Sequence, residues 1–275
     1  MDKSAALFRA SNIVTLDYPL DAALISALAI CDEAVVVVDV NSRDDTRDVV
    51  YELWKRLGRI KIVEREWKFD RMWQEKVWNW GSEATDAEWL MFHDADEAIH
   101  EDHVPEIKGA MDNPDVKLIR FPFIHLYATS AYKIKFQLTH NTRLGRRSVS
   151  YRMRNWCRDD HPKRAVCQMV YGQEEYNAHL SDSPILVTLE NVPVMHYGWC
   201  RSALALAISQ RKHLAWYADG GGLGDGRIPD IAPWGYELAE KIEGGSVTPY
   251  DGPHPAGMQA WFEKHVDEWE ALERE

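Results

Sequence analysis

The sequence is poor in cysteine, and its cysteines follow no pattern that would stabilise a fold. The 275 residues include four cysteines, and no two of them form a CxxC pair. They are scattered along the chain at Cys31, Cys157, Cys167 and Cys200. This excludes a disulfide framework and a zinc knuckle as the basis of the fold. A chain of this length can instead bury a sizeable hydrophobic core, as one large domain or two small ones.

Long apolar runs and an excess of positive charge are also missing. No apolar run approaches the roughly 20 residues that span a bilayer. The first residues, MDKSAALFRASN, lack the apolar core and cleavage pattern of a signal peptide. The sequence therefore predicts a cytoplasmic protein. The formal net charge of −12 argues against indiscriminate binding to nucleic acid or to anionic membranes.

One segment reverses this acidic balance. Between Arg143 and Arg164 there are seven arginines and Lys163, against only Asp159 and Asp160 as acids. Two interpretations stay open, namely a solvated basic face or a site that grips an anionic ligand. The twelve tryptophans are a second excess. Most of them are expected in the core, although indole rings also stack on sugars and bases.

The first hundred residues alternate apolar runs with helical patterns. Strands are predicted at 12–16, 34–40, 60–63 and 88–94. Helices are predicted between them, at 20–30, from about 46 to Gly58, and at about 70–85. This β-α-β order predicts an α/β fold with an open, doubly wound, mainly parallel sheet. In such a sheet, ligands bind at the carboxyl ends of the strands.

The second half is less regular. Strands are predicted at 116–124 and 183–197, and an amphipathic helix at 201–219. A last helix is predicted near the carboxyl end of the chain, from about residue 255. No internal repeat and no clean linker divides the chain, so a single domain is expected.

Acidic side chains follow two of the predicted strands. Asp39 ends one of them, and Asp94 and Asp96 come at the end of another. Since Asp94 and Asp96 are two residues apart, their side chains share one face of an extended segment. Such a pair can hold a hard divalent cation, with water and a diphosphate completing the shell. His196 ends a later strand, where Gly198 lets the backbone turn closely, and it could add a ligand from a different strand.

Three segments of the sequence resemble the family 2 glycosyltransferases, which have the nucleotide-sugar-binding fold called GT-A. VVVVDVNSRDDT is similar to the family's D-x-x-S-x-D-x-T motif, EWLMFHDADEAIHED to its D-x-D strand, and VMHYGWCR to its late H-x-G segment. The three follow the family's order, and the resemblance runs from about residue 10 to about 215. It implies one GT-A domain over residues 1–275, with a nucleotide-sugar-binding half at about 1–115 and an acceptor half at about 116–275.

The resemblance also implies roles for individual residues. Contacts with the nucleotide sugar are expected from Thr15, Asp17, Asp39, Ser42, Arg71, Asn79, Asp94 and Arg211. A Mn²⁺ or Mg²⁺ ion is expected at Asp94, Asp96 and His196. The base that deprotonates the acceptor is expected among Glu174, Glu175 and Asp160. The first strand departs from the family, because TLDYP stands where the family has a T-x-N-E-like segment.

The activity that the resemblance implies is a metal-dependent transfer of a sugar, from a UDP-sugar to an acceptor hydroxyl, with inversion. The tract from Arg143 to Arg164 then suggests an anionic acceptor, such as a phosphorylated glycan, a lipid-linked sugar or nucleic acid.

Three other functions stay open. A nucleotidyltransferase should carry a phosphate loop rich in Gly, Arg or Lys after the first strand, and TLDYPLDAA offers none. A metal-dependent phosphoesterase would need more His and Asp ligands at several strand ends. A catalytically silent relative would bind a nucleotide or a glycan without turnover.

Overall fold

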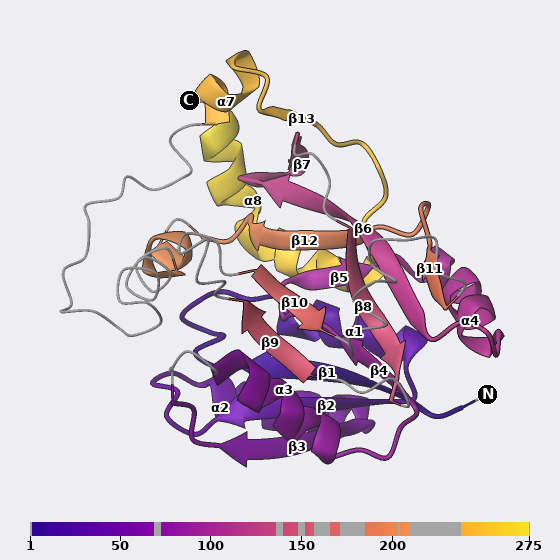
Figure 1. Cartoon of the computed structure of the whole chain (residues 1–275). Coiled ribbons are helices and arrows are strands. Elements are labelled where there is room, and N and C mark those ends of the chain that lie inside the picture. Colours follow the sequence, from indigo (N-terminus) through magenta and orange to yellow (C-terminus); the bar gives the residue numbers. More distant parts are fainter. Residues whose placement is uncertain are drawn as a thin grey trace.

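A parallel four-stranded unit forms the first half of the molecule (Figure 1). The computed structural model describes residues 2–68, 73–135, 140–147, 152–156, 166–170, 185–202, 204–209 and 238–274. The strands of this unit are β1 (Ser4–Ala10), β2 (Glu33–Asp39), β3 (Ile60–Arg65) and β4 (Trp89–Phe92). They lie in the order β4-β1-β2-β3 and are all parallel.

Three helices connect these strands. They are α1 (Leu20–Ile30), α2 (Thr46–Leu57) and α3 (Trp73–Glu83). The helix α2 ends at Gly58, which takes the left-handed conformation with φ of 73° that glycine adopts without steric strain. The four consecutive valines of β2 are fully buried, as expected of a strand that is covered on both faces.

Antiparallel strands extend the unit into one mixed sheet. They are β8 (His140–Arg146), β6 (Leu118–Tyr127), β7 (Thr129–Ile134) and β13 (Val247–Pro249). The sheet order is β13-β7-β6-β8-β4-β1-β2-β3, so the same sheet continues across residue 115. Three short strands attach to it, namely β5 (Glu97–Ile99), β11 (Leu186–Thr188) and β12 (Val194–Trp199). A separate antiparallel pair is formed by β9 (Arg152–Trp156) and β10 (Val166–Val170).

Helices cover both faces of the parallel unit. On one face, α1, α2 and α4 (Val104–Asp112) bury Phe8, Val36 and Val38 in the largest hydrophobic cluster. On the other face, α3 packs Val77 and Trp78 against alternate side chains of the same strands. The predicted α/β class with a doubly wound, mainly parallel sheet is confirmed. In the part of the chain that the structure describes, no helix is long and apolar enough to cross a membrane.

The remaining helices lie mostly near the carboxyl end. They are the short turns η1 (Glu101–His103) and η3 (Ala256–Met258), a helix at 204–209, α7 (Leu238–Glu243) and α8 (Gln259–Arg274). Aromatic side chains of α8, including Trp261 and Phe262, pack against Tyr197 of β12. The predicted last helix is thus a structural cover for the strand that carries His196.

The prediction of a strand at 12–16 is wrong. The first strand is β1, and residues 11–17 form a turn after it. Asn12 and Asp17 have positive φ angles of 51° and 53°, a region that Asn and Asp tolerate better than other residues with a side chain. Ile13 and Leu16 are buried within this turn. Their apolar character therefore reflects packing and not extended backbone.

Candidate functional site

Asp39 is fixed at the carboxyl end of β2. Its carboxylate accepts hydrogen bonds from the Ser11 hydroxyl at 3.0 Å, from the Asn41 N–H at 3.0 Å and from the Trp67 N–H at 3.3 Å. The residue is 2% exposed. A carboxylate offers about four acceptor positions, so one position, on Oδ2, is left among the described contacts. The prediction that Asp39 stands at the carboxyl end of a parallel strand is confirmed by its place in β2, and its contact with a ligand stays a prediction.

The loop after β2 is joined to the turn after β1 by hydrogen bonds from side chains to backbone. The Ser42 hydroxyl accepts from the Asn12 N–H at 3.2 Å, and the Thr46 hydroxyl accepts from the Ile13 N–H at 2.8 Å. Asp44 accepts from the N–H of Thr15 at 2.7 Å. The predicted nucleotide contacts of Ser42 and Thr15 stay predictions. In the structure both residues brace the rim of the site.

Asp94 lies between two arginines just beyond β4. Its carboxylate accepts hydrogen bonds from Arg9 of β1 and from Arg143 of β8, the second at 3.2 Å. Arg143 also pairs with Glu97, and the Cζ atom of Arg9 lies 4.6 Å from the centre of the Trp78 ring. Burial alone would raise the pKa of Asp94, but the two guanidinium groups hold this pKa well below its usual range. The carboxylate is therefore ionised and held in place.

Asp96 faces His196 across two strands. The Nε2 atom of His196 in β12 lies 3.5 Å from Oδ2 of Asp96, which precedes β5. Antiparallel pairing of β5 with β12 brings the two together, and the Tyr197 N–H donates to the Asp96 carbonyl at 2.8 Å. Burial opposes both charges, yet their mutual attraction lowers the pKa of Asp96 and raises that of His196. Asp96 and His196 thus form a largely buried pair at the carboxyl edge.

A second histidine touches His196 from the neighbouring strand. The parallel register of β6 with β12 places His125 directly beside His196. The two Nδ1 atoms are 3.1 Å apart, and the rings meet edge to face with centroids 4.9 Å apart. Burial and the nearby His196 lower the pKa of His125 to about 4, so His125 is neutral at pH 7. One of the two Nδ1 atoms must donate and the other accept.

The donor atoms of Asp96 and His196 suit a divalent cation. A carboxylate oxygen and an imidazole nitrogen are both ligand types that divalent ions take, and the two atoms lie 3.5 Å apart, so Asp96 and His196 would be able to hold the same ion. Gly198 keeps the space between them open. A Cβ atom built at this glycine would lie 2.6 Å from Nε2 of His196 and 2.7 Å from Oδ2 of Asp96.

Only two of the three predicted metal ligands make this pair. Asp94, the third, is engaged by the two arginines. Among the described residues, no group of three or more His, Cys, Asp or Glu side chains could hold a metal ion by itself. A metal ion at this position would need ligands from a bound substrate or from water.

Asp17 is engaged by the C-terminal helix. Its carboxylate accepts from Nζ of Lys264 at 2.5 Å, from Nε2 of His265 at 2.6 Å and from the Ser202 N–H at 3.1 Å. Asp17 is 7% exposed. Its predicted contact with a nucleotide stays a prediction, and in the structure Asp17 ties the turn after β1 to α8.

Other predicted residues are only partly covered by the structure. Asn79 lies on α3, where its carbonyl accepts from the Ser82 hydroxyl at 3.0 Å. Five predicted residues lie outside the described ranges, namely Arg71, Asp160, Glu174, Glu175 and Arg211. Their roles stay predictions.

The first arginines of the basic tract are used inside the molecule. Arg143 pairs with Asp94 as described above. Arg146 pairs with Asp2 at 2.6 Å. Arg147 donates to three backbone carbonyls, those of Ser82, Thr85 and Ala87. These three arginines hold the β4–β8 edge together, and an anion-binding surface on the tract stays a prediction.

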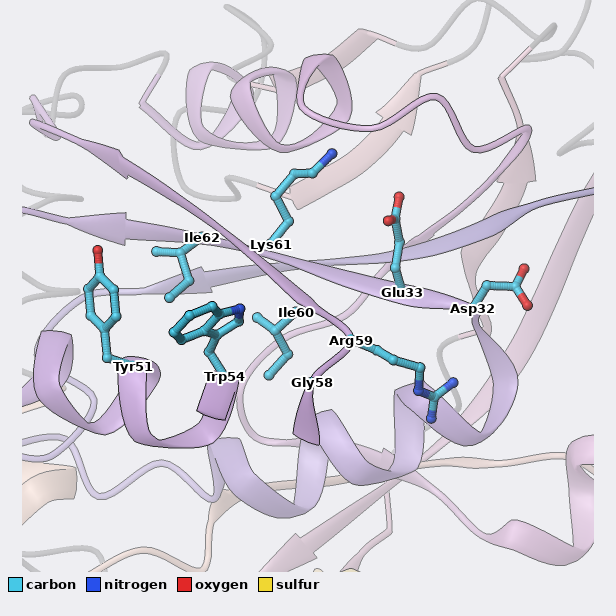
Figure 2. Close-up of a pocket in the computed structure, with 9 residues that line it drawn as sticks. All are labelled: Asp32, Glu33, Tyr51, Trp54, Gly58, Arg59, Ile60, Lys61 and Ile62. Carbon is cyan, nitrogen blue, oxygen red and sulfur yellow. The ribbon is translucent and has the colours of Figure 1, made fainter. Parts of the chain in front are cut away.

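An open cavity of about 520 Å³ lies away from this site (Figure 2). Figure 2 shows Tyr51 and Trp54 of α2 beside Ile60 and Ile62 of β3. These residues and Glu33 lie toward the amino ends of β2 and β3, whereas Asp39 ends β2 at the opposite edge. The cavity is therefore not part of the candidate site.

Sequence reasoning missed three residues that shape the site. They are Arg9, His125 and Arg201. Arg201 is 7% exposed and donates to the carbonyls of Gly198 and Leu16 at 2.9 and 2.8 Å. The signal for Arg9 was a lone charge inside the apolar stretch SAALFRA, because a buried charge needs a partner of opposite sign. His125 gave no comparable signal.

The chain is similar to several solved structures. TarS of S. aureus has 16% sequence identity and a TM-score of 0.49, and the match covers 87% of this chain and 43% of that one. TarS residues 1–349 in complex with UDP-GlcNAc have 13% identity and a TM-score of 0.42, with 87% and 71% covered. The chain thus spans less than half the length of the first of these TarS structures.

A third similar structure is the glucosyl-3-phosphoglycerate synthase of Mycobacterium tuberculosis, solved with Mn²⁺, UDP-glucose and phosphoglyceric acid. It has 16% identity and a TM-score of 0.33, and the match covers 46% of this chain and 44% of that one. No curated protein sequence matches the chain.

The family is decided by the sequence itself. The family model described as "Glycosyl transferase family 2" matches residues 20–167, which is more than half of the chain. The match includes β2 with Asp39 and the segment with Asp94 and Asp96. The expected membership is confirmed: the chain belongs to glycosyl transferase family 2.

Proposed function

We propose that this glycosyltransferase takes its sugar from a UDP-sugar, binds Mn²⁺ or Mg²⁺ at Asp96 and His196, and transfers the sugar to an acceptor hydroxyl with inversion. The observation that carries the proposal is the pair formed by Asp96 and His196, whose facing atoms are 3.5 Å apart with Gly198 beside them. These groups lie at the carboxyl edge of an α/β sheet, where ligands of this fold class bind.

The nucleoside end of the donor is assigned to the edge at β2. The remaining acceptor position on Asp39 Oδ2 suits the imide N–H of uracil, because the other described contacts leave that position open. The strands β2 and β4 are both neighbours of β1, so their ends lie about 10 Å apart at a strand spacing of about 4.8 Å. This separation suits a ligand that places its base at one strand and its diphosphate at the other.

The diphosphate end is assigned to the edge at β4 and β12. When bound, a divalent ion supplies Lewis-acid stabilisation of the charge that develops on the departing diphosphate. Asp96 and His196 would hold it, and Asp94, positioned by Arg9 and Arg143, would accept hydrogen bonds from the ribose.

Inversion requires a base on the acceptor side. In a single displacement, the acceptor oxygen bonds to the anomeric carbon as the bond to the diphosphate breaks, and a carboxylate takes the acceptor's proton. Glu174, Glu175 and Asp160 stay the candidates for that carboxylate. An anionic acceptor stays our proposal for the later part of the basic tract, and a cytoplasmic location stays a prediction of the sequence.

A catalytically silent relative that binds the donor without turnover is the second candidate. Both candidates predict binding, and only the first predicts product. Measurements of ligand binding and of turnover therefore have to be made on the same protein.

The experiment is a thermal unfolding series with and without Mn²⁺ across UDP-, GDP-, CMP- and dTDP-sugars. A ligand at about 100 times its dissociation constant stabilises by roughly 2.7 kcal/mol, which for a chain of this size raises the midpoint by several degrees. We expect the rise only with Mn²⁺ and a UDP-sugar together. The anomeric configuration of the product, read by NMR, tests inversion. No rise with any pair, in folded protein, would overturn the proposal.

A further inference from the structure

We propose that His125 is a positioning residue that holds His196 in the form that can bind a metal ion. The proposal is that the Nδ1–H of His196 donates to Nδ1 of His125, which leaves the lone pair of His196 Nε2 directed toward Asp96. This inference rests on the proposed metal-dependent function and adds to it a residue that touches neither the metal nor the substrate.

The sheet places the two rings together. His125 and His196 are register partners in the parallel pair β6–β12, and neighbouring partners in a sheet point their side chains to the same face. Their Nδ1 atoms lie 3.1 Å apart, within the usual range for a hydrogen bond to nitrogen. The edge-to-face arrangement, with 72° between the ring planes, lets one N–H point at the lone pair of the other ring.

Proton accounting decides the direction of this bond. A neutral imidazole carries one proton, on either Nδ1 or Nε2. The Nε2 atom of His196 is the one that faces Asp96, 3.5 Å away. If Nε2 binds a cation, the proton of His196 has to be on Nδ1. The contact at 3.1 Å is then attractive only if Nδ1 of His125 accepts, so the proton of His125 is on its Nε2.

The same contact fixes the orientation of the His196 ring. Gly198 gives the ring of His196 its place, because a Cβ atom there would lie 2.5 Å from Cε1 and 2.6 Å from Nε2 of His196. The hydrogen bond to His125 holds the ring from the side opposite to Nε2. Partners of this kind, which orient a metal-binding histidine through its other nitrogen, typically change metal affinity 10- to 100-fold when they are removed.

The test compares two substitutions of His125. In His125→Asn, the side-chain oxygen is attached at the same Cγ position as Nδ1 and keeps an acceptor near it. His125→Phe keeps a ring of similar size but removes the acceptor. Binding of Mn²⁺ is measured by the loss of the EPR signal of free Mn²⁺, with UDP present and no acceptor. His140→Phe, at an exposed histidine that pairs with Glu190, is the matched control.

We expect His125→Phe to bind Mn²⁺ roughly 10- to 100-fold more weakly than the unchanged protein. His125→Asn should recover most of the affinity, and the control should bind as the unchanged protein does. Equal affinity in His125→Phe, with circular dichroism showing a folded protein, would overturn the inference and leave the proposed function standing. No Mn²⁺ binding by the unchanged protein would overturn both.

A measurement on the unchanged protein covers the case in which His125→Phe does not fold. ¹⁵N-histidine NMR with diamagnetic Cd²⁺ reports which ring nitrogens carry protons, and His125→Asn assigns the signals. We expect a proton on Nδ1 of His196 and on Nε2 of His125. A proton on Nδ1 of His125 in the metal-loaded protein would contradict the proposal.

Discussion

The loops that follow β2 and β4 lie at the same edge of the sheet but are held in different ways. After β2, side-chain oxygens accept hydrogen bonds from backbone N–H groups, as in the 2.8 Å contact from the Ile13 N–H to the Thr46 hydroxyl and the 2.7 Å contact from the Thr15 N–H to Asp44. After β4, charges do the holding, because Asp94 lies between two arginines and Asp96 faces His196. The first loop is held by hydrogen bonds to backbone N–H groups, and the second by pairs of opposite charge.

This difference bears on what each loop can do. A hydrogen bond to a backbone N–H depends on position and changes little with salt. A carboxylate that is compensated by a single partner can exchange that partner for a cation, because the electrostatic requirement is for positive charge and not for one side chain. The loop after β2 therefore suits a rigid rim, and the segment after β4 suits an exchangeable ion.

The largest effect is expected from Asp96→Asn, which keeps the shape of the side chain and removes its charge. Metal-dependent turnover of the nucleotide sugar should fall on the order of 10³-fold, because the loss of several kcal/mol of charge stabilisation is at stake. Steady-state kinetics with saturating Mn²⁺ measures it. Asp102→Asn, at a carboxylate that is 83% exposed, should turn over normally. Unchanged turnover in Asp96→Asn would overturn the proposal that Asp96 and His196 hold the metal ion.

The next largest effect is expected from Arg143→Met. This change leaves the nearby carboxylates of Asp94 and Glu97 short of positive charge. Breaking a buried pair from one side destabilises by about 3–5 kcal/mol, and urea unfolding measures the loss. Lys55→Met, which removes an exposed pair with Glu52, should change stability by less than about 0.5 kcal/mol. A loss no larger than in Lys55→Met would show that charge does not hold this segment.

Gly198→Ala tests the open space between the two donor atoms. The added Cβ would lie within 2.7 Å of both Asp96 and His196, so Mn²⁺ should bind at least about 10-fold more weakly. Calorimetric titration measures the affinity. Gly109→Ala is the matched control, because a Cβ on that exposed helical glycine meets nothing within 4 Å. It should keep the affinity and gain up to about 1 kcal/mol in stability.

A smaller effect is expected from Thr46→Val at the start of α2, where the loop after β2 ends. The Ile13 N–H loses its acceptor in a buried position, which costs about 1–3 kcal/mol. This loss should be the same at low and high salt, whereas that of Arg143→Met should shrink as salt screens the remaining acids. Unfolding at two salt concentrations measures both variants. A strong salt dependence of the stability loss in Thr46→Val would contradict the view that the two loops are held in different ways.

The smallest effect is expected from His265→Gln, through the pair with Asp17. Burial opposes the charge of His265, but the hydrogen bond to Asp17 raises the pKa of His265, and that of Asp17 is lowered. The contribution of His265 to the stability of the folded protein is fully present below the unfolded pKa of about 6.5. It is lost as pH rises through the raised pKa of His265 in the folded protein. That of Asp17 is present above about 3.9 and is lost as pH falls further.

The variant should therefore be destabilised by up to about 1 kcal/mol more at pH 5.5 than at pH 9. Thermal unfolding at the two pH values measures the difference. An equal loss at both would mean that His265 acts only by packing on α8.

The sequence patterns predicted those elements of the fold that are determined by residues close together in the sequence. The valine run and Asp39 marked β2 and its carboxyl end, and Gly58 marked the end of α2. The turn at 12–16 was mistaken for a strand, because the side chain of Ile13 is buried by packing in the hydrophobic cluster with residues far away in the sequence. An apolar residue in the sequence does not show whether it is buried in a strand or in a turn that packs against a distant part of the chain.

Sequence alone determined the family, the alternation of strands and helices, and the place of Asp94 and Asp96 just beyond a strand, whereas His196 lies within β12 and not at its end. Only the tertiary structure decided which partner each of Asp94, Asp96 and His196 has. In the structure, Arg9 and Arg143 pair with Asp94. His196 faces Asp96 and is itself contacted by His125. The physical reason is that a charge takes its role from partners a few ångströms away in space, and here those partners lie as many as 100 residues away along the chain.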